Sequence, residues 1–226
     1  MKEVLDFLRD LSEHNYKEWF DANKERYLHA RACMDSLVTE LIAGIRKFDG
    51  SIGPLQAKDC SYRIYRDLRF SKDKTPYKNH MGAYINRGGK KSGYSGYYFH
   101  LGSPLVGNML AVGDIWCPPE VLKAIREDIL LGGGDFRRIL AGADKRLHLD
   151  SDAALKRVPA PFPKDTPDSE YFKYKYFCLC YAPGDGFFTA KGTERRLLEV
   201  FESTRPFLDY INRAFDYVSE QKRLAY

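Results

Sequence analysis

The residues best suited to chemistry lie in one short basic segment, residues 63–78. This segment holds six cations against two carboxylates, so it accounts for four of the five positive charges that the chain carries in excess. Arginine offers a planar fork to a phosphate or carboxylate, lysine adds a movable point charge, and tyrosine adds a neutral donor. This mixture suits an oxyanion, and the candidate anion-binding residues are Arg63, Arg66, Arg69, Lys74, Tyr77 and Lys78.

Arg66 stands out because residues 61–70 alternate as a β-strand does. Residues two apart share one face of a strand, so Arg66 shares its row with apolar side chains, while Arg63 and Arg69 lie on the opposite row with Asp67. A guanidinium keeps its proton at ordinary pH, and burying it without a partner is costly. We therefore expect Arg66 to contact a carboxylate, backbone carbonyls or a bound anion.

Catalytic residues are not identified by the sequence, and two side chains are candidates. Asp67 would orient a neighbouring arginine or act as a base. His100 has the side chain whose ordinary pKa lies closest to neutrality, and a structural histidine with both nitrogens bonded is the alternative. The five histidines and five cysteines show no zinc-ligand spacing, so we expect neither a metal nor a cofactor.

Apolar spacing predicts the elements that position these residues. Spacings of three and four indicate helices within residues 4–11, 15–48, 118–132, 135–143 and 197–218, with Asn15 as a helix cap and a break after Thr204. Alternation predicts strands over residues 61–70 and 174–182. Residues 80–87 are of types that strands tolerate, and two further short strands are predicted over 96–102 and 108–116, separated by Gly102 and Pro104. Four prolines predict an irregular crossing over 158–167.

Short connections between successive strands favour antiparallel pairing. The sequence therefore predicts an α+β fold, with a mainly antiparallel sheet of about five strands flanked by N-terminal and C-terminal helices. No repeat or low-complexity linker interrupts the chain, so we expect a single domain over residues 1–226.

Three stretches resemble a known family. RIYRDLRFSKDKTPYKNH, NYKEWFDANKERY and GYYFHLG are similar to the bacterial family catalogued as domain of unknown function 2461, and the resemblance covers nearly the whole chain. The family's arginine, aspartate, arginine and phenylalanine pattern matches Arg66, Asp67, Arg69 and Phe70, and its other conserved parts match residues 71–74 and 76–78. The resemblance implies a soluble bacterial protein and brings no activity with it.

Composition excludes other classes of protein. No apolar run approaches the ~20 residues that span a bilayer, and charges interrupt the opening residues where a signal peptide needs an apolar core. The odd number of cysteines favours reduced thiols. We therefore expect a cytoplasmic protein without a membrane partner.

Three functions remain open. The protein binds an anionic small molecule, with or without catalysis; or it is a structural or partner-binding module whose basic segment is an internal ion-pair network; or it binds nucleic acid. The isoelectric point of about 8.8 disfavours nucleic acid, because the chain outside the basic segment is nearly neutral. The sequence does not indicate an oligomeric state.

Overall fold

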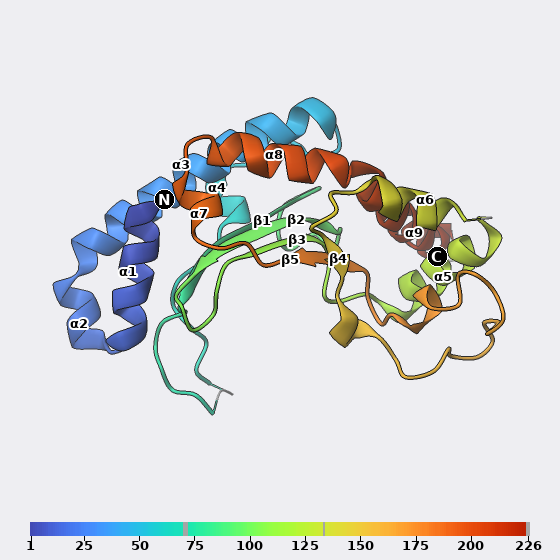
Figure 1. Ribbon diagram of the computed structural model, residues 1–226, viewed down its shortest axis with the longest axis horizontal. Helices are drawn as coiled ribbons and strands as arrows, with labels where there is room; N and C mark the ends of the chain where they lie inside the picture. The colour runs from blue at the N-terminus through green and yellow to red at the C-terminus, as the bar shows by residue number, and fades with distance from the viewer. Residues whose placement is uncertain (70–71, 133, 225–226) are drawn as a thin grey trace. The chain divides into compact units, whose positions relative to one another are not determined.

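The computed structural model describes residues 1–69, 72–132 and 134–224, and its backbone divides into two compact units (Figure 1). The first unit comprises Met1–Ser92, Tyr97–Leu110 and Ala182–Glu199, and the second comprises Gly93–Gly96, Ala111–Tyr181 and Val200–Tyr226. The prediction of a single domain stays a prediction.

The sheet has five strands in the order β1-β2-β3-β5-β4 and is antiparallel, as predicted. The strands are β1 (His80–Asn86), β2 (Gly96–Gly102), β3 (Met109–Gly113), β4 (His148–Leu149) and β5 (Cys178–Tyr181). Four of them lie within predicted strands. β4 was not predicted, because two residues are too few to show alternation.

The predicted strand over residues 61–70 is wrong over its described part, residues 61–69. Only two isolated bridges form, Ser61 with Ala83 and Tyr65 with Tyr77, and Phe70 lies outside the described residues. The Asp67 carboxylate accepts the backbone N–H of Arg69 at 3.2 Å, and the chain bends at Arg69. Such side-chain bonds to the backbone compete with a β-ladder, and they explain why the alternation does not produce a strand.

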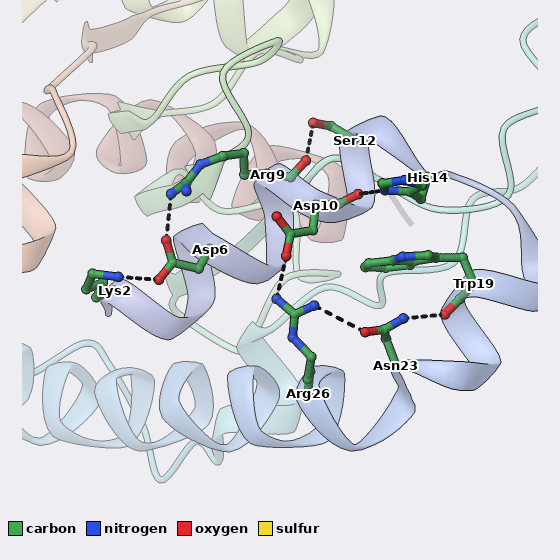
Figure 2. Close-up of polar contacts among 9 residues, drawn as sticks. All are labelled: Lys2, Asp6, Arg9, Asp10, Ser12, His14, Trp19, Asn23 and Arg26. Carbon is green, nitrogen blue, oxygen red and sulfur yellow. Dashed lines mark hydrogen bonds and ion pairs between the residues drawn. The ribbon is translucent and has the colours of Figure 1, made fainter.

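Helices α1 (Lys2–Glu13), α2 (Lys17–Ala22), α3 (Lys24–Phe48), α4 (Ala57–Cys60) and α7 (Gly186–Thr189) belong to the first unit. The predicted apolar stripe of α1 is buried, including Phe7 and Leu8. Figure 2 shows the polar contacts beside it: Asp10 on α1 accepts from Arg26 on α3 at 2.6 Å, and the His14 ring stacks on Trp19 with centroids 5.5 Å apart. These contacts tie the N-terminal helices together.

Asn15 does not cap α2, contrary to the prediction, since α2 begins after Tyr16 and has no side-chain cap. The Asn15 amide instead brackets the backbone of Tyr77, donating to its carbonyl at 3.0 Å and accepting its N–H at 3.1 Å. It also donates to Asn79 Oδ1 at 2.8 Å. Asn15 therefore fixes the end of the basic segment, a long-range role that no local pattern reveals.

The second unit contains α5 (Pro119–Leu131), α6 (Asp135–Gly142), α9 (Arg205–Leu224) and two short 3-10 helices, Ser151–Ala153 and Tyr171–Lys173. Helix α8 (Thr193–Ser203) ends before Thr204, and α9 begins at Arg205, which confirms the predicted break ahead of Pro206. Residues 158–167 form turns and bends without regular structure, also as predicted.

Among residues 1–69, 72–132 and 134–224, no helix has a stretch long and apolar enough to cross a membrane.

Candidate anion-binding site

The first half of the basic segment folds back on β1 as an irregular hairpin. The backbone N–H of Arg66 donates to the Pro76 carbonyl at 3.0 Å, that of Lys78 to Ile64 at 2.8 Å, and that of Tyr62 to Gly82 at 3.0 Å. Residues 62–66 therefore run beside residues 76–82, which brings together residues at opposite ends of the basic segment.

Helix α3 holds the start of this hairpin. Arg31 donates through its guanidinium to the Tyr62 carbonyl at 2.9 Å and pairs with Asp35 at 2.8 Å. The second oxygen of Asp35 accepts the Ser61 hydroxyl at 3.0 Å. Helix α3 therefore fixes the position of Tyr62, through one bond to the Tyr62 carbonyl and one to the Ser61 side chain.

Arg66 has partners within the chain. The alternation correctly predicted the two rows: Ile64 is buried and Arg66 partly buried, whereas Arg63, Asp67 and Arg69 are exposed. Arg66 donates to the Asp73 carboxylate and to the Thr75 hydroxyl. The hydrogen bond from Arg66, followed by the bonds from Thr75, lowers the pKa of Asp73 to about 2. The Asp73 carboxylate is therefore the partner that the sequence predicted Arg66 to need.

Arg69 and Lys74 also form bonds within the loop. Arg69 contacts Asp67 through two bonds, Nε to Oδ1 at 3.0 Å and a terminal guanidinium nitrogen to Oδ2 at 2.6 Å. These bonds lower the pKa of Asp67, so Asp67 is ionised and occupied. Lys74 donates to the Leu68 carbonyl at 3.1 Å. The structure places these groups in a loop held by its own side chains.

Tyr77 is a packing residue. The residue is 4% exposed, and its ring stacks on Phe20, with centroids 4.0 Å apart and planes inclined by 13°. Tyr65 covers it at 5.5 Å. Burial raises the pKa of Tyr77. The ring anchors the loop between Asn15 and Lys78.

Lys78 lies in a different environment, half-buried with its ammonium 5.4 Å from the ring centroid of Tyr62. Burial lowers the pKa of Lys78, and the positive charge of Arg63 lowers it further. His80 is also half-buried, and burial followed by the charge of Lys78 lowers the pKa of His80. In the described part of the chain, no carboxylate pairs with Lys78, Arg63 or His80.

His100 completes this group from β2. The Gly107 carbonyl can only accept, so His100 Nε2 carries the proton that it donates there at 3.1 Å, and Nδ1 accepts the Tyr98 hydroxyl at 2.9 Å. Burial, and then the nearby His80, lowers the pKa of His100 to about 4. His100 is thus a neutral partner of Tyr98 with both nitrogens occupied. A catalytic role for His100 or Asp67 stays a prediction.

A chain of contacts connects Lys78 to His80 through two tyrosines and His100. The ammonium of Lys78 lies over Tyr62, Tyr62 meets Tyr98 at 6.3 Å between centroids, and the rings of His80 and His100 are 4.9 Å apart. We call the set the Lys78 cluster, and its members are Tyr62, Arg63, Lys78, His80, Tyr98 and His100.

Of the predicted anion-binding residues, the structure brings only Arg63 and Lys78 into the Lys78 cluster. Sequence reasoning missed Tyr62, His80 and Tyr98 as site residues. The signal was available in part, since residues two apart share a face, which places His80 with Gly82 on β1 and Tyr98 with His100 on β2. The register between those strands could not be read from the sequence.

Gly82 allows the two strands to approach closely at this point. A Cβ atom added to Gly82 would lie 2.7 Å from the Cβ of His100 and 2.7 Å from the carbonyl oxygen of Phe99. Any larger residue would displace His100 from Tyr98.

Comparison with known families places this arrangement in context. A family model described as "Conserved hypothetical protein (DUF2461)" matches residues 3–210, which include the whole basic segment and the Lys78 cluster. Comparisons with curated proteins and with solved structures found no match.

Proposed function

The chain belongs to the DUF2461 family of conserved hypothetical proteins, and we propose that it binds a small phosphate- or carboxylate-bearing ligand at the Lys78 cluster. The observation that carries the proposal is the half-buried Lys78 ammonium, which has another cation beside it and no carboxylate partner among the described residues. A buried charge is costly unless it is paired. A bound anion would supply the missing partner.

The remaining members of the cluster suit such a ligand. Arg63 is exposed, and its guanidinium can form two parallel hydrogen bonds to a phosphate or carboxylate. The Tyr62 ring covers one side of the Lys78 ammonium. The Tyr98 hydroxyl donates its hydrogen bond to His100, so its oxygen can still accept one. This combination supports a small ligand that carries an anionic group together with a hydroxyl or amine donor.

A structural role for residues 66–75 is the second candidate, and it applies to a different part of the segment. Arg66 pairs with Asp73, and Arg69 pairs with Asp67. These exposed or partly exposed pairs contribute little free energy each. They support the sequence-based alternative of an internal ion-pair network that shapes the loop leading to Lys78.

Two further parts of this proposal come from the sequence. The chain acts as a single domain, and it acts in the bacterial cytosol. The five cysteines are free thiols, which supports a reducing compartment.

Replacing Lys78 by methionine is expected to abolish most anion binding. Methionine keeps an unbranched apolar side chain and removes the charge. A hydrogen bond to a charged group contributes ~1.5–3 kcal/mol, so Lys78→Met should weaken binding roughly tenfold to a hundredfold. The measurement is calorimetric titration with inorganic phosphate and, separately, acetate, in chloride buffer at constant ionic strength.

Lys74→Met is the matched control, because Lys74 belongs to the same segment and donates only to the Leu68 carbonyl in the described structure. We expect it to bind as the wild type does. Equal weakening by Lys74→Met would show that binding follows overall charge, and absence of saturable binding by the wild type would contradict the proposal.

A further inference from the structure

A small cavity in the second unit is lined by residues from separate parts of the chain. Its volume is about 20 Å³, and its walls come from residues 93–95, from within residues 114–125, from Phe177 and from helix α9. Asn212 on α9 fixes the first of these segments, because its side-chain amide donates to the Ser95 carbonyl at 3.1 Å and accepts the Ser95 N–H at 3.0 Å. A cavity needs ~10–15 Å³ to hold one water molecule, so this cavity admits a single group of that size.

Asp114 is a half-buried carboxylate of this cavity. It follows β3 directly, and its Oδ1 accepts the backbone N–H of Trp116 at 3.0 Å. Burial raises the pKa of Asp114, although hydrogen bonds from the backbone of Trp116 and Ile115 oppose that rise. Within residues 1–69, 72–132 and 134–224, no cation forms an ion pair with Asp114. A buried charge is costly unless it is paired, so the Asp114 carboxylate favours a cationic ligand.

Two neighbours of Asp114 set the charge and the access of the cavity. Burial, and then the charge of Asp114, raises the pKa of the Cys117 thiol to about 12, so this thiol is neutral at pH 7. Asp114 is therefore the one charged side chain among the described residues that line the cavity. Trp116 also lines it and is 67% exposed, so a ligand can reach the cavity from solvent along the indole. The face of an indole attracts cations within ~6 Å of its centre, which again favours a positively charged ligand.

We propose that this cavity binds the ammonium group of a small primary amine. An ammonium group is close to water in size, so it fits the volume, and it brings the N–H donors and the positive charge that the Asp114 carboxylate lacks. The first carbons of the alkyl chain pack on apolar walls such as Val121 and Phe215, and the chain leaves past Trp116. A quaternary ammonium is too large for the cavity and has no N–H to donate.

NMR titration of the full-length protein with n-butylammonium chloride tests this site. The chain has two tryptophans, so Trp116→Phe assigns the indole N–H signal of Trp116. We expect n-butylammonium to shift this signal saturably, whereas sodium chloride at equal ionic strength and tetramethylammonium chloride should not. A lysine side chain carries the same group, and Nα-acetyl-lysinamide is therefore titrated in parallel. Tighter binding of the lysine derivative would overturn the assignment to a free amine and assign the site to a lysine of a protein partner.

Two pairs of variants, measured by calorimetric titration with n-butylammonium, separate the cavity from its surroundings. Asp114→Asn is expected to weaken binding roughly tenfold to a hundredfold, because the bond to a charged group is lost. Asp152→Asn removes an exposed carboxylate of the same unit and should bind as the wild type does. Trp116→Ala should weaken binding roughly threefold to thirtyfold through loss of the cation–π contact. Ile115→Ala is its control, since Ile115 is equally exposed and lies outside the cavity lining.

Three results would overturn the proposal. Absence of a saturable shift in the wild type would leave the cavity to water alone. Equal affinity of Asp114→Asn and the wild type would show that the carboxylate does not hold the ligand. Equal affinity for tetramethylammonium and n-butylammonium would assign the binding to the exposed indole and not to the cavity. If Asp114→Asn fails to fold, Trp116→Ala decides the question, because Trp116 is exposed and its loss leaves the carboxylate in place.

Discussion

Acidification from pH 7.5 to pH 4.5 is expected to lower the free energy of unfolding by about 2 to 3 kcal/mol through His100 alone. The pKa of His100 is about 4 in the folded protein, against an ordinary value of 6.5. The unfolded chain therefore binds more protons between these values, and stability is lost as the pH falls through this window. The cause is burial of an imidazole whose two nitrogens bond as the neutral form requires.

His100→Gln provides the measurement, by urea unfolding of both proteins at the two pH values. The variant should be less stable at pH 7.5, and the gap should close by about 2 to 3 kcal/mol at pH 4.5, because the other titrating groups are common to both proteins. His29→Gln, at an exposed histidine, controls for the loss of a histidine as such. A gap of equal size at both pH values would show that His100 titrates normally.

Gly82→Ala is expected to destabilise the protein by about 2 kcal/mol or more, since overpacking a close contact typically costs ~1–3 kcal/mol. The added methyl would lie 2.7 Å from both the Cβ of His100 and the carbonyl oxygen of Phe99. Neither atom is at the end of a flexible side chain, so the strands themselves must separate. Thermal and urea unfolding measure the loss.

The same substitution should break the bond between Tyr98 and His100, which NMR detects as a His100 pKa nearer the ordinary value. Gly53→Ala is the control, because no atom lies within 4 Å of the place its Cβ would take. If Gly82→Ala and Gly53→Ala had equal stability, the close approach of β1 and β2 would not be the reason for glycine at position 82.

Most of the fold could be predicted from the sequence, because the pattern of a long element remains recognisable when one or two of its residues depart from it. Alternation located β5, strand-forming residue types between turn signals located β1, β2 and β3, and apolar spacing located α1 and α5. The prediction of a strand over residues 61–70 failed because a local bond replaces strand pairing there. The Asp67 carboxylate accepts the backbone N–H of Arg69, two residues along the chain. Prediction also failed at β4, whose two residues pair only because β5 lies beside them.

The site was predictable only in part. The alternation correctly indicated that Arg66 needs a partner, but the partner is Asp73 in the loop that follows. Lys78 was identified by its charge alone. Its neighbours depend on the register between β1 and β2 and on Asn15, whose bonds to Tyr77 span more than sixty residues of sequence. Contacts of this range leave no local pattern.

NMR titration of the ε-carbon of Lys78 tests whether this half-buried cation binds an anion. Burial and Arg63 should hold the pKa of Lys78 below its ordinary value in chloride buffer, and saturating phosphate should raise it, because a bound anion favours the charged form. Lys78→Met assigns the signal. An ordinary pKa that phosphate leaves unchanged would contradict the account.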